Sequence, residues 1–363
     1  MYRVLAALLV TAAALVAAGL FADGEAEQPP RTATPTLTAV APEPERPARL
    51  TVSVSGDLLP HLPVVDRART ATGYDFAPLL RDLRPVVRRA DVAFCHVETP
   101  MQRGPPAGYP RFRTPPALAQ AIRATGWDAC STASNHSIDQ GAAGVRSTIA
   151  ALNRAGLGHT GSAVSPRGRR RVLLLRRRGV AIAFLAYTVH TNGLPVPHRW
   201  SVNLASPPRI VRDARRARRK GADAVVVNLH WGTEYRHSPD AQQLSIARRL
   251  SRSKAITAIM GQHAHVVQPI RRVGGRWVVF GSGNLLSNQS AACCPAATQD
   301  GMVVTLHLRV PPGRRATVEK IRYTPTWVRH PDMRVLRARP GDRSWTRTVQ
   351  VVGSRKGLRP ARR

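Results

Sequence analysis

Lysine is scarce in this chain of 363 residues: of its 55 basic residues only four are lysines, and the others are arginines. Aromatic residues make up 5% of the chain, and no recognisable nucleic-acid-binding motif accompanies the formal net charge of +34. The composition therefore argues against specific nucleic-acid recognition, which uses such motifs and interleaved aromatics. An arginine excess of this kind is typical of a GC-rich genome. It predicts a solvated cationic surface that meets polyanions, such as anionic envelope polymers, nonspecifically.

Cysteine is also scarce, with four residues in the chain, Cys95, Cys130, Cys293 and Cys294. None of them stands directly after the apolar N-terminal run, which argues against a lipid-modified N-terminal cysteine. Cys95 and Cys130 each lie near the end of an expected core strand, so a disulfide between them is possible in an oxidising compartment. The alternative is that both are small buried hydrophobic residues.

The N-terminal segment is apolar and is followed by a proline-rich stretch. Residues 1–22 contain "VLAALLVTAAALVAAGLF", an uncharged run of 18 residues that follows Arg3. Its small residues near Ala17 and Ala18 suit a cleaved secretory signal peptide, and its length just permits an uncleaved membrane anchor. Residues 23–48 lack apolar periodicity and read as an extended linker. Both alternatives predict an extracytoplasmic body, either secreted or anchored to the cell membrane.

From residue 49 onward, strand-like apolar runs alternate with amphipathic helical stretches. The near-continuous apolar strands predict an α/β domain over residues 49–330 whose sheets are covered by helices. Residues 75–90 are expected to be helical with a kink near Pro85, and residues 170–188 to form a hairpin around "RRRG". Residues 331–363 are rich in arginine, and we expect them to be a basic tail with a disordered end.

Polar side chains gather where the predicted strands end, at the edge of an α/β sheet where ligands usually bind. Each one alone has an ordinary structural explanation, such as a turn for a Gly-Asp pair or a helix cap for an Asn-His pair. Together they form an oxygen and nitrogen donor set without thiolate, which suits zinc, manganese or iron. The donors are Asp57, His96, Glu98, Asn135, His136, Asp139, His230, Glu234, His263, His265 and Asn284.

The segment "IMGQHAHVVQPI" carries two of these donors, His263 and His265, one residue apart. On an extended strand, alternate residues point to the same face. The spacing therefore predicts that both imidazoles reach one site.

Six motifs in this order carry a family resemblance: "SGD", "HVETP", "SNHSIDQG", "HWGTEY", "GQHAHVVQP" and "GSGN". Over roughly residues 49–310 the chain resembles the capsule-synthesis protein CapA family, which is associated with poly-γ-glutamate capsule production. That family is in turn similar to the calcineurin-like metallophosphoesterases. The resemblance implies a four-layer α/β/β/α sandwich and a metal site of one or two divalent ions.

The resemblance also implies roles for individual residues. Asp57 and His265 would hold a first metal, and Glu98 would bridge two metals. The second metal would be held by Asn135, His230 and His263. His136 would donate a proton to the leaving oxygen. Arg111 and Arg113 are candidates for binding substrate oxygens, although a solvated loop is the simpler role for both.

Two departures bear on the first metal. Metallophosphoesterases have Asp-x-His, but Leu59 stands two residues after Asp57. His61 would replace the missing histidine only if its loop bends back. CapA-like sequences generally have Asn where this chain has His96, and that change adds either a ligand or a hydrogen bond. We place Glu234, Asp139 and Asn284 as further donors or as residues that orient the ligands.

The sequence leaves three functions open. The first is a metal-dependent hydrolase of a phosphoester in an envelope polymer or its precursor. The second is a non-catalytic component of a polymer synthesis or export complex, and the third is a module that binds anionic polymer. Whether the chain is an enzyme is not decided at this stage.

Overall fold

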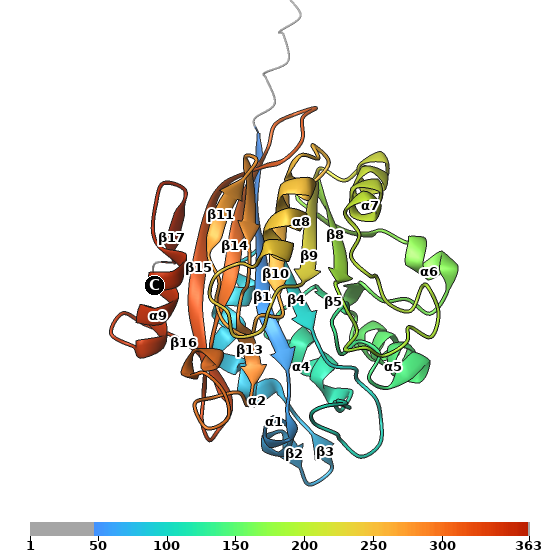
Figure 1. Cartoon of the computed structure of the whole chain (residues 1–363), viewed down its shortest axis with the longest axis vertical. Coiled ribbons are helices and arrows are strands. Elements are labelled where there is room, and N and C mark those ends of the chain that lie inside the picture. The colour runs from blue at the N-terminus through green and yellow to red at the C-terminus, as the bar shows by residue number, and fades with distance from the viewer. Residues whose placement is uncertain (1–46, 362–363) are drawn as a thin grey trace, which may run out of the picture. The chain divides into compact units, whose positions relative to one another are not determined.

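Two β-sheets packed face to face form the centre of the fold. The structure, a computed structural model, describes residues 47–361. The expected signal peptide or anchor, residues 1–22, lies outside the described residues, as does most of the linker expected over residues 23–48. Figure 1 shows the element order along the chain.

The first sheet has nine strands in the order β16-β15-β14-β1-β4-β5-β6, with β13 paired to β1 and β17 paired to β15. Its strands are β1 (Ala48–Leu59), β4 (Val92–Val97), β5 (Ala129–Ser131), β6 (Gly158–Thr160), β13 (Asn284–Ser287), β14 (Asp300–Val310), β15 (Thr317–Arg329), β16 (Arg334–Arg337) and β17 (Leu358–Pro360). Strands β1, β4, β5 and β6 pair in parallel, whereas β14 pairs antiparallel with both β1 and β15.

The second sheet has six strands in the order β11-β12-β10-β9-β8-β7. They are β7 (Leu173–Arg177), β8 (Val180–Thr188), β9 (Ala224–His230), β10 (Ala258–Gln262), β11 (Ile270–Val273) and β12 (Arg276–Val279). Strands β2 (Arg69–Thr70) and β3 (Gly73–Tyr74) form a separate small ribbon. The hairpin expected over residues 170–188 is present as β7 and β8, joined through Arg178 and Gly179, both of which have positive φ.

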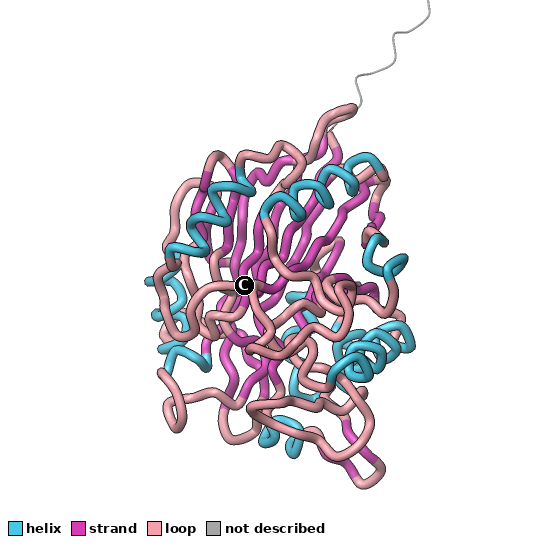
Figure 2. The backbone as a smooth tube through the Cα atoms, turned by 45° about the vertical axis from the view of Figure 1, so that its right-hand side comes forward, coloured by secondary structure: helices cyan, strands magenta, loops and turns pink. Residues whose placement is uncertain are grey.

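Helices cover the outer faces of both sheets, as Figure 2 shows. They are α1 (Leu62–Arg67), α2 (Ala77–Leu80), α3 (Arg84–Arg88), α4 (Ala117–Thr125), α5 (Gly141–Arg154), α6 (Pro166–Arg170), α7 (Pro207–Arg219), α8 (Ala241–Ser251) and α9 (Arg343–Val352), with short 3-10 turns η1 (Arg81–Leu83) and η2 (Ala296–Gln299). Pro85 does more than kink the helix expected over residues 75–90. It lies in the first turn of α3, and the segment is divided into α2, η1 and α3.

Three apolar layers hold the sheets and helices together. Val52, Val54 and Leu306 of the first sheet pack against Phe184 and Met260 of the second. The alternate residues of the first sheet face helices α2 to α5, and those of the second sheet face α7 and α8. The expected four-layer α/β/β/α arrangement is therefore confirmed, because each sheet is apolar on both faces.

The prediction of a basic tail over residues 331–363 is wrong for residues 334–360. This segment contributes β16, α9 and β17, which pack along β15 (Figure 1). Arg347 of α9 makes two hydrogen bonds, of 2.6 and 2.7 Å, to the buried carboxylate of Asp300. Val352 and Leu358 are buried. The apolar residues of this segment are widely spaced among many arginines. The sequence pattern therefore did not predict that the segment packs against β15.

Cys95 and Cys130 form a disulfide between the paired strands β4 and β5, with their Cα atoms 4.3 Å apart. Of the two alternatives left open by the sequence, the bridge is the one present.

Among residues 47–361, no helix is long and apolar enough to cross a membrane.

Candidate metal centre

The site lies where strands of the two sheets end next to each other. Asp57 lies near the end of β1, where a bulge follows it, and its backbone N–H donates to the carbonyl of Gly283 at 3.0 Å. A side chain on Gly56 would clash with that same carbonyl oxygen. The glycine of "SGD" is therefore needed for the close approach of the two chains that sets Asp57 in place.

A first group of buried side chains comes from β1, β4, the residue after β4, and β9. Asp57, His96, Glu98 and His230 each place one donor atom within 4.8 Å of the other three. The Nε2 atom of His96 lies 3.8 Å from Oδ1 of Asp57, and that of His230 lies 3.6 Å from Oε1 of Glu98. These separations are close to the edge lengths that shared coordination of one ion requires.

A second group joins Glu98 to His263 and His265, again within 4.8 Å. The Nε2 atom of His265 lies 3.8 Å from Oε1 of Glu98, and its Nδ1 atom lies 3.5 Å from Oδ2 of Asp57. Glu98 belongs to both groups, which fits the bridging position implied for it.

The backbone that carries His263 and His265 is not extended, so the reasoning from strand alternation is wrong. Strand β10 ends at Gln262, and His263 and His265 both have positive φ, 92° and 55°. Their ring centroids still lie only 5.9 Å apart. A non-glycine residue rarely adopts these angles, and such strained conformations cluster at functional sites.

Several buried atoms of the cluster have no hydrogen-bond partner among the described residues. They are Oδ1 of Asp57, both carboxylate oxygens of Glu98, both ring nitrogens of His96, and Nδ1 of His230 and of His263. Leaving so many polar atoms unpaired in the interior costs free energy unless a cation compensates them. The donors present fit a divalent metal ion, because each unpaired atom is of a type that ligates one.

The pKa shifts follow from this burial. Burial raises the pKa of Glu98 well above its usual range and lowers the pKa of His96 to about 4. Burial also lowers the pKa values of His230 and His263 well below the usual range, so both rings are neutral. For His265, burial alone would lower the pKa, but the carboxylates of Glu98 and Asp57 outweigh it and raise the pKa to about 9.

His96 and not His61 takes the place beside Asp57. The Nδ1 atom of His61 lies 3.0 Å from the carbonyl oxygen of Leu59, and its ring lies edge-on to Phe112. His61 belongs to neither group of donors. Neither ring nitrogen of His96 has a hydrogen-bond partner among the described residues, so both are free to bind a metal ion.

His136 is oriented by Asp139, whose Oδ2 atom lies 2.8 Å from Nδ1 of the imidazole. The edge of Phe112 packs against the same ring, with centroids 4.7 Å apart. This pairing leaves Nε2 as the nitrogen available for a substrate proton. Arg111 donates to the backbone carbonyl of Asp139, and Arg113 donates to the side chain of Gln140, so both arginines brace this loop.

The remaining predicted donors surround the cluster. The Oδ1 atom of Asn135 lies 2.8 Å from Nε2 of His230, and that of Asn284 lies 3.0 Å from Nδ1 of His265. Glu234 lies 3.9 Å from Nε2 of His265 and is 41% exposed at its side chain, so it lies at the rim of the cluster beside His265.

Sequence reasoning missed His190, which follows β8. Its Nε2 atom lies 3.3 Å from Nε2 of His263. Asn192, two residues further on, accepts a hydrogen bond of 3.2 Å from Asn135. The signal was present, because "TVHTNG" follows a core strand just as the other donor segments do.

The sequence of the chain matches a known family and several curated proteins. The family model described as "Bacterial capsule synthesis protein PGA_cap" matches residues 51–289. The chain is 26% identical over 284 residues to the capsule biosynthesis protein CapA of Bacillus anthracis, covering 75% of this chain and 67% of that one. It is 30% identical over 180 residues to the PGA biosynthesis protein CapA of Bacillus subtilis, covering 49% of this chain and 46% of that one.

Among solved structures, the chain is similar to the calcineurin-like phosphoesterase YfkN from Bacillus subtilis. The TM-score is 0.50 and the identity 16%, over 84% of this chain and 96% of that one. At this identity the likeness concerns the fold. It agrees with the layered arrangement of sheets and helices described above.

Proposed function

We propose that this chain, which belongs to the PGA_cap family of bacterial capsule synthesis proteins, is a metal-dependent hydrolase of a phosphoester or phosphoanhydride in a capsule polymer or its precursor. The observation that carries the proposal is the buried group of Asp57, His96, Glu98 and His230, with its unpaired oxygen and nitrogen atoms. A purely structural cluster would pair these atoms with one another or with the backbone.

The ligand types favour Mn²⁺, Zn²⁺ or Fe²⁺, because carboxylate and imidazole donors are present and thiolate is not. When bound, one or two such ions supply Lewis acidity at a phosphoryl oxygen and activate water near neutral pH. The residues that would hold the ions are Asp57, His96, Glu98 and His230 in one group and Glu98, His263 and His265 in the other, with Asn135 beside His230.

His136 would then donate the proton that the leaving oxygen requires. Asp139 fixes the ring through Nδ1, so that Nε2 carries the proton toward the substrate. His190 lies beside His263 and is half-buried, which places it at the edge of the cluster where a substrate oxygen would bind.

A second candidate function is a non-catalytic component of a capsule polymer synthesis or export complex, working beside a polymer synthetase or exporter. Leu59 favours it, since the histidine expected at this position in a phosphoesterase is absent. The presence of His96 beside Asp57 restores the donor count and favours hydrolysis.

We also propose that the protein acts outside the cytoplasm, secreted or anchored through its N-terminal segment. The uncharged run after Arg3 and the Cys95–Cys130 disulfide support this location, because disulfides persist in oxidising compartments. A fusion of alkaline phosphatase to the C-terminus of the full chain tests it. An active fusion in intact cells is expected, and an inactive but abundant fusion would contradict it.

Turnover by the purified protein tests the hydrolase proposal. The chelated protein is reloaded separately with Mn²⁺, Zn²⁺ or Fe²⁺ and assayed on p-nitrophenyl phosphate and on bis(p-nitrophenyl) phosphate. Turnover that is lost on chelation and restored by one of the metals is expected. Stoichiometric metal without turnover on phosphoesters or on capsule polymer would contradict hydrolysis and support the assembly role.

A further inference from the structure

A cleft of about 960 Å³ opens on the outer face of the nine-stranded sheet, away from the metal centre. We call it the cationic cleft and define it by Arg89, Arg322, Arg337, Arg339, Trp345 and Arg359. Its volume is in the range of ligand-binding pockets. Thr51 at the start of β1 lines it, whereas Asp57 of the metal centre lies six residues further along the same strand, about 20 Å away at 3.3 Å per residue.

The cleft exists because the outer face of the sheet changes from apolar to polar along its strands. On β14, Val303 packs under the helices, but Thr305 and His307 on the same face are only half-buried. On β15, Val328 is buried, whereas Arg322 and Thr324 line the cleft. The helices cover the apolar part, and the polar part stays open between the end of α3 and the C-terminal segment.

The charge of the cleft has one sign. Five of its 17 lining residues are arginines, and none is Asp or Glu. The arginines come from separate elements: Arg322 from β15, Arg337 from β16, Arg359 from β17 and Arg89 from the end of α3. Arg322 and Arg359 are direct neighbours in the pairing of β15 with β17. Burial, together with Lys320 and Arg322, lowers the pKa of His307, which agrees with a positive field on this face.

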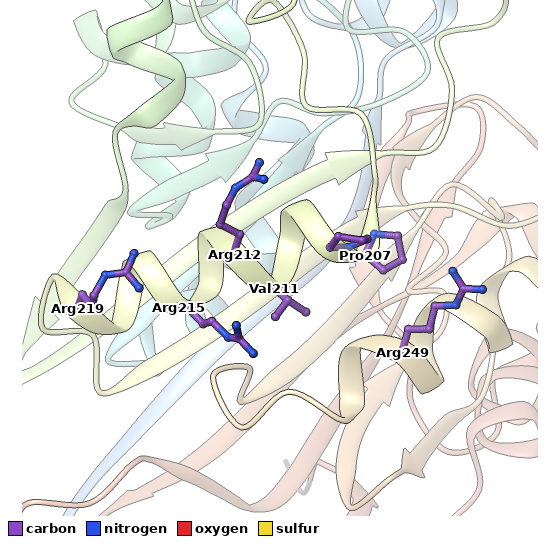
Figure 3. Close-up of a pocket in the computed structure, with 7 residues that line it drawn as sticks. Pro207, Val211, Arg212, Arg215, Arg219 and Arg249 are labelled. Carbon is purple, nitrogen blue, oxygen red and sulfur yellow. The ribbon is translucent and has the colours of Figure 1, made fainter.

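Arginine alone does not distinguish a site on this protein. A groove beside α7 presents Arg212, Arg215 and Arg219, with Arg249 of α8 opposite them (Figure 3). Its other lining residues are Pro207, Pro208 and Val211, so it has no hydroxyl groups and no aromatic ring. The cationic cleft adds Thr305 and Thr324 as hydrogen-bonding groups and Trp345 as an apolar wall. The α7 groove is therefore a natural control.

We propose that the cationic cleft binds an anionic polymer chain that bears repeated carboxylates. Guanidinium groups distributed over several elements suit single charges spaced along a chain, and each can pair bidentately with one carboxylate. Trp345 and the neighbouring prolines offer apolar surface to the methylene groups between those charges. The identity of the ligand rests on the capsule-polymer context proposed above, but binding does not depend on turnover at the metal centre.

Most of the cleft lies after the part of the chain that the family model matches. The family match covers residues 51–289, whereas Arg322, Arg337, Arg339, Trp345 and Arg359 all lie after it. The C-terminal segment thus supplies most of the walls, and its docking on β15 creates the site.

Calorimetric binding of a short γ-linked glutamate oligomer to the full chain, in the presence of chelator, tests the proposal. The double variant Arg322→Gln, Arg359→Gln is compared with Arg212→Gln, Arg215→Gln, which removes the same charge from the α7 groove. A loss of at least about tenfold is expected for the cleft variant and less than about twofold for the control, because charge-assisted pairs in a shaped cleft outweigh exposed ones. Arg89→Gln, Arg337→Gln provides a second cleft variant if the first is unstable.

Three results would overturn the proposal. The first is no measurable binding of the oligomer to the unmodified protein. The second is an equal loss in both double variants, which would assign binding to the general arginine surface. The third is equally tight binding of polyphosphate or duplex DNA in the same cleft, which would contradict the carboxylate class. Binding that persists in chelated protein without turnover would support this site while the hydrolase proposal failed separately.

Discussion

The metal centre and the cationic cleft share strand β1 but are built in opposite ways. At the metal centre, carboxylates and imidazoles are almost fully buried and partly unpaired, as for Glu98 at 1% exposure. In the cleft, arginines are half-buried or exposed and face solvent. The first arrangement costs free energy unless a cation is bound, whereas the second is tolerated without a ligand. On a strongly basic protein, buried polar groups without partners therefore indicate a metal site, whereas exposed charge alone does not indicate any site.

The backbone shows the same contrast. Gly56 permits a close chain approach, and His263 adopts a strained conformation, both to aim side chains at the metal centre. Three of the cleft arginines, Arg322, Arg337 and Arg359, extend from ordinary strands. A single substitution at the metal centre should therefore cause a large loss of turnover or metal affinity. A single substitution in the cleft should cause a smaller loss of oligomer affinity.

The largest expected effect is on catalysis. His136→Ala should lower turnover by about 10²–10⁴, because the leaving oxygen loses its proton donor, while metal content and oligomer binding stay unchanged. Asp139→Asn should shift the pH profile of turnover and cause a smaller loss. Steady-state rates from pH 5 to about 9 measure both. Unchanged turnover in His136→Ala would remove this residue from the mechanism.

A smaller effect is expected on metal affinity. His96→Asn should weaken binding of the metal by about 10–100-fold, since one nitrogen donor beside Asp57 is lost. His61→Asn is the matched control and should change affinity little, because His61 belongs to neither donor group. Competition with a fluorescent chelator measures both constants. Equal affinities in the two variants would place His96 outside the coordination sphere.

The stabilisation that metal confers should grow with pH. In metal-free protein, the raised pKa of His265, about 9, adds stability that is complete below about pH 6.5 and is lost as the pH rises through 9. The raised pKa of Glu98 acts in the same direction. Metal binding must displace these protons, so affinity should rise up to about tenfold per pH unit for each proton displaced.

The difference in melting temperature between loaded and chelated protein, scanned from about pH 6 to pH 9, measures this linkage. A difference that shrinks with rising pH would contradict it. His230 and His263 stay neutral across the scan, since their pKa values lie below the usual range, and they add no dependence of their own.

The smallest expected effect is a difference between the two sites in how strongly salt changes their binding affinities. Raising the salt concentration from about 0.05 to 0.5 M should weaken oligomer binding in the cleft several-fold, because exposed charges are screened. Metal affinity should change little, since the donors are buried. Titrations at the two concentrations measure this. Equal salt dependence at both sites would undo the contrast between buried and exposed charge.

The clustering of the buried donors could be predicted from the sequence because the donors follow core strands. Asp57, Glu98 and His230 lie near strand ends in an α/β alternation, and such ends meet at one edge. The conformation of "GQHAH" was not predictable, because the strain of His263 is imposed by the surrounding structure. Whether His96 or His61 completes the set depended equally on a loop whose path only the structure gives.

The cleft could not be predicted from the sequence. About half of its walls come from residues 337–361, where a few apolar residues such as Val352 and Leu358 are separated by arginines and prolines. Such a segment lacks a clear period of either 2 or 3.6, so composition favoured a solvated tail. Its docking is decided by long-range contacts, such as the pair of Arg347 with buried Asp300.

The most direct test of the central claim is the metal content of the full chain, purified without chelator, beside the double variant His263→Ala, His265→Ala. Elemental analysis should find about one or two equivalents of a transition metal in the unmodified protein and almost none in the variant. Absence of metal from both proteins, even after addition of Mn²⁺ or Zn²⁺, would contradict the claim that this buried cluster is a metal centre.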